Sequence, residues 1–419
     1  MTFVPTTFEQ IDSASELQAS SAPSVFSIEG SESAFGLKLP CWESSLFQWL
    51  ITEASGKHIS IPGLLFEDKE PGNALRKLRD SLVGATLCLQ PAELFTRPEP
   101  KIVIELREEL LRQLENWPDL ASTKGAFVIC ADHLLSSRVS RVKSENKQRY
   151  RLPNRLYPVV NDDRPADWAA FNSLVLDLTR HVSGGDMQPV WFNQQNDPSI
   201  PTILHELFKN THDHARTWWD GSEPSFSVRG ISCAYYAVEQ FPHLTRAIGK
   251  EVLDPPSVYI RELLDVEQNK LKKLRTVQSS KIRGFLELSI FDSGPGLVGR
   301  AKGQDASNFS PKEQLDIVRE CLRKGYSSTE NETRGYGLSK VIARLRQSKG
   351  FLRIRTNSVN GFRSFARFGD LGVSENADSD SAADRLMDWR NLYSPLQTNY
   401  RALRGTVITL IVPMGDVDE

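Results

Sequence analysis

The chain has 419 residues, more than one hydrophobic core usually spans, so two domains are expected. An apolar fraction of 39%, a charged fraction of 25% and a net charge of −2 are typical of a soluble globular protein and give no general attraction to nucleic acid or to an anionic membrane. Nucleic-acid binding through a local basic patch stays open. The five cysteines include no C-x-x-C pair, which disfavours a disulfide framework and a zinc site.

The start of the chain has neither the basic residues nor the apolar run of a signal peptide. No stretch approaches the roughly 20 apolar residues of a membrane helix. We therefore expect a cytoplasmic protein with no membrane segment.

Residues 1–25 are rich in Ser, Thr, Ala and Glu and are expected to form a flexible tail. Residues 26–190 follow an α/β rhythm and are expected to form an N-terminal α/β domain of unknown role. Its predicted strands are 58–65, 84–89 and 125–131, and its clearest helix is 105–117. The segment GSESAFGLK (30–38) superficially suggests a phosphate-binding loop, but its glycine spacing is one residue too long and no Ser or Thr follows the lysine.

A second block, residues 195–415, opens with an amphipathic helix that contains HELFKNTHDHA (205–215). Glu206, Asn210 and Asp213 fall on a polar face beside an apolar stripe. The stripe consists of Ile203, Leu204, Leu207 and Phe208. An Asn oxygen is a suitable Mg²⁺ ligand, and a Glu one turn earlier could orient and deprotonate a water. A surface helix with ordinary polar residues is the alternative.

Residues 240–282 have the composition of a polar helical insertion. Its basic run indicates either a solvated helix face or a contact with a polyanion. The run consists of Lys270, Lys272, Lys273 and Arg275. The next segment, LELSIFDSGPGL, predicts a strand that ends at Asp292 and turns through Gly294 and Gly296. A carboxylate at a strand end can accept a hydrogen bond from an adenine amino group, although a plain Asp-Gly turn has the same sequence.

Residues 298–334 are rich in Gly, Lys, Ser and Asn and predict a lid that orders over a triphosphate. Ser310, Pro311 and Glu313 supply an N-cap, a first-turn proline and a capping-box acid for one helix, which is expected to end near Gly325. The lid residues that could contact phosphate are Lys324, Ser327, Ser328 and Arg334. A polar loop without a ligand is the alternative.

In RGYGLSKV, Gly335 and Gly337 immediately precede a helix, so backbone N–H groups and the helix dipole would face a phosphate chain. A second expected insertion, 358–400, contains the acidic segment 374–384, which reads as an exposed loop. The last motif, GTVITL (405–410), predicts a strand.

The order and sequence of these four motifs resemble the GHKL superfamily, which includes DNA gyrase, the large heat-shock chaperone, histidine kinases and MutL. The resemblance covers 195–415 and implies an α/β sandwich, in which a mixed sheet carries helices on one face and ATP lies between helices and lid. By the resemblance, Glu206 is the catalytic, water-activating acid and Asn210 binds Mg²⁺. The residues implied in ATP binding are Asn210, Asp213, His214, Asp292, Gly294, Gly296, Lys324, Gly325, Ser327, Ser328, Arg334, Gly335, Tyr336, Gly337, Leu338, Gly405 and Thr406.

The sequence lacks a clear phosphoacceptor site, and its histidines are not expected to form a metal cluster. A histidine kinase would need a phosphoacceptor on a helical hairpin upstream, and the candidates His133 and His181 read as ordinary structural or surface residues. The three histidines around the Asn motif are spread around the helix axis, which disfavours a metal cluster. These are His205, His212 and His214, of which His214 is better read as a phosphate-side contact.

The chain ends almost at the last predicted strand, whereas gyrase and MutL relatives continue into a domain that sends a Lys to the terminal phosphate. The missing cation must come from the lid, the N-terminal domain or a partner. The lid candidates are Lys302, Arg323, Lys324 and Arg334. This arrangement predicts slow basal turnover, because a positioned cation can accelerate phosphoryl transfer by orders of magnitude.

The sequence therefore predicts an ATP- and Mg²⁺-dependent switch that hydrolyses ATP slowly and signals to residues 26–190 or to a protein partner, including a second copy of the chain. A histidine-kinase-like protein kinase and a non-catalytic nucleotide sensor are the alternatives.

Overall fold

The computed structural model describes most of the chain, with gaps. The described residues are 2–3, 8–12, 25–29, 39–61, 70–115, 126–136, 153, 155–158, 164–185, 187–189, 200–241, 254–274, 282–323, 337–366, 386–392 and 399–416. Within these ranges no helix is both long and apolar enough to cross a membrane. The segments 30–38 and 374–384, for which the sequence suggested a loop, lie outside the described residues.

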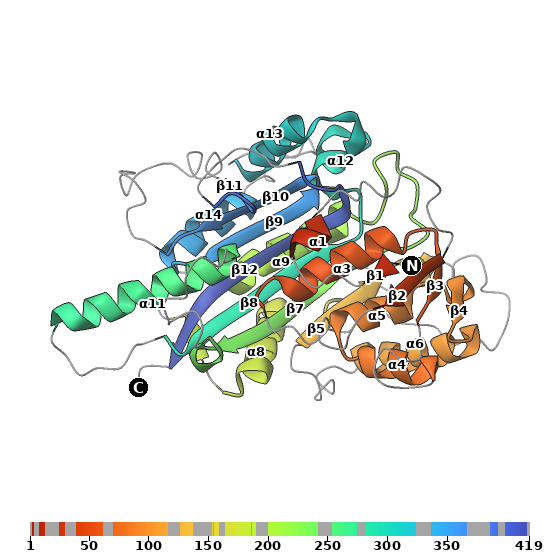
Figure 1. Ribbon diagram of the computed structural model, residues 1–419, viewed down its shortest axis with the longest axis horizontal. Coiled ribbons are helices and arrows are strands. Elements are labelled where there is room, and N and C mark those ends of the chain that lie inside the picture. Colours follow the sequence, from red (N-terminus) through yellow and green to blue (C-terminus); the bar gives the residue numbers. More distant parts are fainter. Residues whose placement is uncertain are drawn as a thin grey trace.

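Helices and strands are interspersed through the described parts of the chain (Figure 1). Up to residue 190 they are β1 (Thr2–Phe3), α1 (Phe8–Asp12), β2 (Val25–Glu29), α3 (Trp42–Glu53), β3 (His58–Ser60), α4 (Pro71–Leu78), α5 (Leu82–Leu89), η3 (Ala92–Leu94), β4 (Phe95–Arg97), α6 (Pro100–Glu115), β5 (Ala126–Ala131), α7 (His133–Ser136), α8 (Trp168–Ser183) and β6 (Met187–Pro189). Beyond it they are α9 (Ile200–His214), β7 (Val228–Ala237), η5 (Val238–Gln240), α11 (Pro255–Leu274), β8 (Gly284–Asp292), α12 (Gly296–Lys302), η6 (Ala306–Asn308), α13 (Pro311–Leu322), α14 (Gly337–Gln347), β9 (Phe351–Asn357), β10 (Val359–Ser364), β11 (Met387–Asp388) and β12 (Leu403–Asp416).

The larger sheet has the strand order β11-β10-β9-β12-β8-β7-β5, and β6 pairs with the end of β12 off this path. Every pairing between its described strands is antiparallel. Strands β5 and β6 come from the segment that the sequence assigned to the N-terminal domain. The sheet of the C-terminal block therefore includes strands from both sides of residue 190.

The smaller sheet has the order β1-β2-β3-β4 with parallel pairings, and it lies beside the larger sheet near the N-terminus (Figure 1). The expected α/β class is confirmed. The expectation that parallel and antiparallel strands share the sheet of residues 195–415 is not met among the described strands, because the parallel pairings lie in the smaller sheet.

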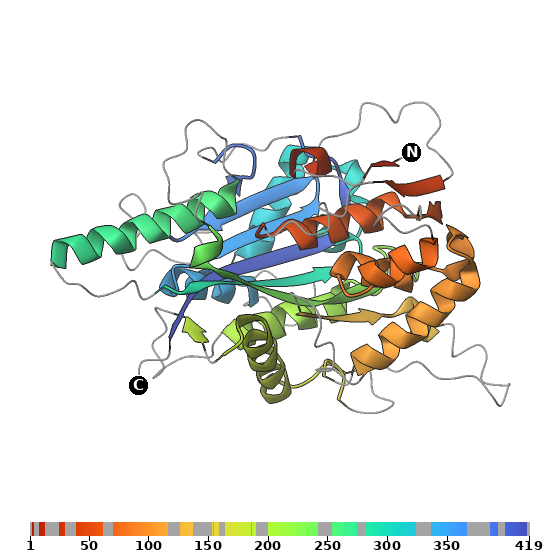
Figure 2. The same cartoon turned by 60° about the horizontal axis from the view of Figure 1, so that its bottom comes forward.

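Helices cover both faces of the larger sheet (Figure 2). Helices α8, α9 and α14 pack on one side, whereas α3 and the first half of α11 pack on the other. The expectation of helices on one face is therefore wrong. Strand β8 shows the physical reason: Phe285 and Phe291 are as deeply buried as the alternate residue Leu288, so both faces of the strand need an apolar cover.

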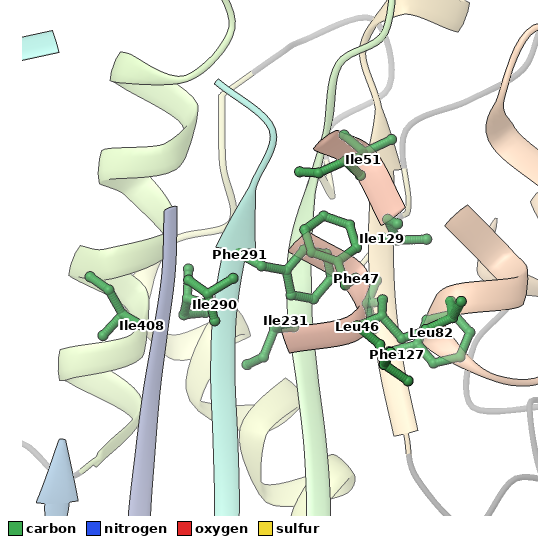
Figure 3. Packing of buried hydrophobic residues seen from close by; sticks show 14 of the residues in the cluster. Leu46, Phe47, Ile51, Leu82, Phe127, Ile129, Ile231, Ile290, Phe291 and Ile408 are labelled. Carbon is green, nitrogen blue, oxygen red and sulfur yellow. The ribbon is translucent and has the colours of Figure 1, made fainter. Parts of the chain in front are cut away.

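Helix α3 provides much of the second cover. Its Phe47 ring lies 4.5 Å from the ring of Phe291, centroid to centroid, and both side chains are fully buried (Figure 3). Leu46 and Ile51 extend this contact toward β5 and α5 (Figure 3). Burial of a large apolar side chain stabilises a fold by roughly 1.5–3 kcal/mol, so α3 is an integral part of the core.

The segment 84–89, predicted as a strand, is part of helix α5. All eight residues of this helix are buried, and Ser81 caps it by accepting a hydrogen bond from the Gly84 backbone N–H at 3.1 Å. A helix that is apolar on every side carries no 3.6-residue periodicity, so its sequence cannot be told from that of a buried strand. The other predictions in this region hold where they are described: β3, β5 and α6 form at 58–60, 126–131 and 100–115.

The two expected insertions contribute to the fold. The first half of α11 packs on the sheet through Tyr259, Ile260 and Leu263, although the side chains of its basic run lie outside the described part. The segment 358–400 begins with β10, a paired strand of the larger sheet. In the lid segment, α13 begins at the predicted capping box of Ser310 and ends at Leu322, slightly before the predicted end.

Candidate functional site

Asp292 is the last residue of β8 and lies opposite Thr406 of β12 and Arg229 of β7. Its Oδ1 accepts hydrogen bonds from the backbone N–H groups of Gly294, at 2.9 Å, and Thr406, at 3.3 Å. Burial raises the pKa of this carboxyl to about 6, while these N–H donors and the nearby guanidinium groups of Arg229 and Arg404 oppose the shift. The structure thus holds a buried carboxylate in a fixed orientation at a strand end.

The glycines around Asp292 are required by close backbone approach. A Cβ on Gly294 would lie 2.7 Å from the Cα of Ala215, and one on Gly405 would lie 1.9 Å from the Asp292 carbonyl oxygen. Gly296, with φ of +78°, would place a Cβ 2.3 Å from Asn357 Oδ1. These glycines let three separate chain segments meet at Asp292, a role that packing alone explains.

A group of hydroxyl and amide side chains lies beside Asp292 at the end of β9. Thr356 Oγ1 is 3.2 Å from Thr406 Oγ1 and accepts a hydrogen bond from the Leu297 N–H at 3.0 Å. Asn357 Nδ2 donates to the Pro295 carbonyl at 3.1 Å. Thr356 and Asn357 were missed in the sequence because they are the last two residues of an ordinary strand with no glycine; the short turn between β9 and β10 was the local signal.

Arg404, which the sequence also did not indicate, holds the loop after β8 through its guanidinium group. Its Nε donates to the Ser293 carbonyl at 2.8 Å and its Nη2 donates to the Phe226 carbonyl at 2.6 Å. The guanidinium lies 4.7 Å from the ring centroid of Trp218. Burial lowers the pKa of Arg404 to about 10, and the charge of Asp292 opposes this. Arg404 therefore remains a cation beside the carboxylate at neutral pH.

Helix α9 carries the predicted polar face, and its C-terminal end lies next to this loop. Its apolar stripe is buried as predicted, while Glu206 and Asn210 are partly exposed. The Glu206 side chain is 42% exposed, with Oε1 3.9 Å from His205 Nδ1. Asp213 and His214 lie on the last turn, immediately before Ala215, which touches the loop at Gly294. The structure thus brings the end of α9 against the Asp292 loop.

The predicted phosphate end of the site is described only in part. Gly337 and Leu338 are the first residues of α14, and α14 packs against α9. The remaining predicted lid and glycine-turn residues lie outside the described residues. They are Lys324, Gly325, Ser327, Ser328, Arg334, Gly335 and Tyr336.

A buried polar network anchors α9 to the sheet. Arg229, 2% exposed, forms an ion pair with Asp132 and donates through Nε to the Tyr157 hydroxyl at 2.9 Å. The same hydroxyl lies 3.2 Å from Nδ1 of His212 on α9. Because a buried guanidinium needs partners, this chain of contacts fixes the helix relative to β7 and to residues before 190.

The other histidines have structural surroundings. Both ring nitrogens of His133 lie within hydrogen-bond distance of the backbone, at Ser227 and Leu89, and burial lowers the pKa of this imidazole. His205 Nε2 lies 3.0 Å from the Ala166 carbonyl oxygen. His181 is in the last turn of α8 and half-buried. The part of the chain that the structure describes contains no His, Cys, Asp and Glu cluster able to hold a metal ion.

Two lid cations predicted to reach the phosphates belong to the described residues. Lys302, at the end of α12, lies 3.4 Å from Glu320 Oε2 in an exposed ion pair. Arg323 follows the last residue of α13. An exposed ion pair is worth about 0–1 kcal/mol, so the pairing of Lys302 does not hold it away from a ligand.

Comparison with known proteins adds no assignment: no family model, no curated protein and no solved structure matches the chain.

Proposed function

We propose that the protein binds Mg·ATP as a GHKL-type ATPase and that slow hydrolysis of the nucleotide drives a conformational switch. The observation that carries the proposal is the Asp292 carboxylate, which is buried and held through Oδ1 by the N–H groups of Gly294 and Thr406. Both of these hydrogen bonds use Oδ1, which leaves Oδ2 to accept the amino group of an adenine. A base recognised in this way needs a hydrogen-bond acceptor held in a fixed position, and a carboxylate makes this bond stronger than a neutral acceptor would.

The position of α9 supports the same proposal. Its C-terminal end lies against the Asp292 loop, so a nucleotide with its base at Asp292 would extend its phosphates along the polar face that carries Asn210 and Glu206. Asn210 would ligate Mg²⁺ between the phosphates, and Glu206 would orient the attacking water. The partial exposure of Glu206 leaves it accessible to water.

The surroundings of His133 disfavour phosphorylation at this candidate acceptor. Its imidazole is half-buried with both nitrogens against backbone groups, so neither is presented to a phosphoryl donor. The conformational change driven by hydrolysis would be transmitted to residues 26–190, to a protein partner or to a second copy of the chain.

The test is phosphate release by the wild type and by Glu206→Ala, with Glu105→Ala, an exposed acid on α6, as the matched control. Loss of one general base typically lowers the rate by about 10²–10⁴-fold, while ATP affinity should be retained. Equal rates in wild type and Glu206→Ala, with tight ATP binding in both, would refute the hydrolytic role.

Incubation with γ-labelled ATP separates the remaining alternatives. Label retained on protein would favour a kinase. Binding with neither retained label nor released phosphate would favour a non-catalytic sensor.

A further inference from the structure

Helix α3 makes specific polar contacts with the turn that precedes Thr406, on the face of the sheet opposite α9. Gln48 is fully buried, and its Nε2 donates to the carbonyl oxygens of Arg355, at 3.1 Å, and Gly405, at 3.3 Å. One turn later, the Thr52 hydroxyl accepts a hydrogen bond from the Arg404 backbone N–H at 2.8 Å. Side chains of α3 thus hold the backbone of two consecutive residues at the start of β12.

Those two residues hold the Asp292 loop in turn. The Gly405 N–H donates to the Gly294 carbonyl at 3.1 Å, and the Arg404 guanidinium donates to the Ser293 carbonyl. The next residue, Thr406, donates to Asp292 itself. A Cβ on Gly405 would lie 1.9 Å from the Asp292 carbonyl oxygen, so the turn packs closely against the backbone of Asp292.

A second path runs from helix α1 to the same loop. The Asp12 carboxylate, 1% exposed, pairs with Arg355 Nε at 3.1 Å, and Arg355 Nη1 donates to the Asn357 carbonyl at 2.6 Å. The Asn357 side chain then donates to the Pro295 carbonyl. Helices α1 and α3 therefore each reach the 292–296 loop through a chain of hydrogen bonds.

The α3 contact is incompletely satisfied. Among the described residues no donor reaches Gln48 Oε1, although the side chain is fully buried. The Gln48 side chain is therefore held at this interface through its two Nε2 hydrogen bonds. Apolar contacts such as Phe47 with Phe291 hold α3 against the sheet (Figure 3). The hydrogen bonds of Gln48 and Thr52 fix its position relative to the start of β12.

We propose that α3 is the element that couples the N-terminal region to the nucleotide: Gln48 and Thr52 are positioning residues that hold the Asp292 loop in its binding geometry. The inference rests on the proposed function. Because coupling between two sites is reciprocal, binding at Asp292 would tighten the docking of α3, and release of α3 would weaken binding at Asp292. In this way, nucleotide binding at Asp292 would change the docking of the N-terminal region on the opposite face of the sheet.

The test uses the full chain with Thr52→Val, Thr52→Ser and Gln48→Leu. Thr86→Val is the matched control, because Thr86 is buried and, among the residues that the structure describes, its hydroxyl bonds within α5, to the Leu82 carbonyl. Amide hydrogen exchange over 292–297 and 403–408 is measured first without nucleotide. We expect faster exchange in Thr52→Val and Gln48→Leu and wild-type exchange in Thr52→Ser and in the control.

ATP affinity and phosphate release are then measured on the same proteins. The coupling predicts affinity about tenfold weaker for Thr52→Val, restored in Thr52→Ser, with an unchanged rate of hydrolysis at saturating ATP. In the wild type ATP should slow exchange in α3, and this effect should be reduced in Gln48→Leu.

The outcomes separate the inference from the proposed function. Unchanged amide exchange at 403–408 in both Thr52→Val and Gln48→Leu overturns the positioning role, regardless of the ATP affinity of these variants. Faster exchange with wild-type ATP affinity overturns the coupling. Faster exchange in a protein whose wild type binds no nucleotide supports the positioning role and overturns the proposed function. Thr52 is only half-buried, so its variants keep the test valid if Gln48→Leu does not fold.

Discussion

Asp292→Asn isolates recognition of the base from stability of the loop. An Asn side chain keeps an Oδ1 that can accept from the Gly294 and Thr406 N–H groups, so both hydrogen bonds of the loop can persist. The other oxygen becomes an NH₂ donor, which cannot accept an adenine amino group. Since a hydrogen bond to a charged group contributes about 1.5–3 kcal/mol, ATP affinity should fall by about 10- to 150-fold.

Calorimetric titration of Mg·ATP into the wild type and Asp292→Asn measures this change, and the Tm of each protein reports on its fold. Asp316→Asn, an exposed carboxylate on α13, is the matched control and should bind ATP as the wild type does. Wild-type affinity in Asp292→Asn, with an unchanged Tm, would refute the role assigned to Asp292.

The pH dependence of ATP affinity gives a second test of the role of Asp292. Burial raises the pKa of Asp292 to about 6, so in the protein without nucleotide the carboxylate loses its charge as the pH falls through that value. ATP affinity of the wild type should therefore decrease from neutral pH to about pH 5, as the acceptor becomes protonated. Asp292→Asn should lack this decrease, and a parallel decrease in both proteins would point to another titrating group.

Two further predictions concern stability. Gly405→Ala should lower the free energy of unfolding by more than about 2 kcal/mol, because φ is +76° and the new Cβ would meet the Asp292 carbonyl. The control Gly303→Ala, with φ of +61° and open space around it, should lower it by only about 1 kcal/mol. Equal losses for the two variants in chemical denaturation would contradict the close-approach argument. Burial raises the pKa of Glu287 from 4.5 to about 7, so its stabilising contribution is complete below the unfolded value and is lost as the pH rises through about 7. The rise in pKa from 4.5 to about 7 corresponds to a loss of at most about 3–4 kcal/mol, and Glu287→Gln should show a flatter stability profile between about pH 4.5 and about pH 7; superimposable profiles would contradict this.

Local signals in the sequence predicted several elements of the C-terminal block correctly. The apolar stripe of α9, the strand that ends at Asp292 and the Ser310 capping box each depend on residues within one or two turns of one another. Such patterns are set by the geometry of a single helix or strand, so they can be read without knowledge of the rest of the chain.

The features that were missed depend on contacts between distant residues. Arg404 is 111 residues from Ser293, and Gln48 is 357 residues from Gly405, so no local pattern marks either contact. The same holds for β5, which pairs with β7 across about a hundred residues and places part of the expected N-terminal domain in the larger sheet. The assignment of the site residues to ATP stays a prediction.

Binding of Mg·ATP to the wild-type protein tests the central claim most directly. Calorimetric titration near neutral pH should give one site per chain for ATP, weaker binding without Mg²⁺, and loss of this Mg²⁺ dependence in Asn210→Ala. No heat of binding and no change of Tm at millimolar Mg·ATP, in a protein that is folded, would contradict the account.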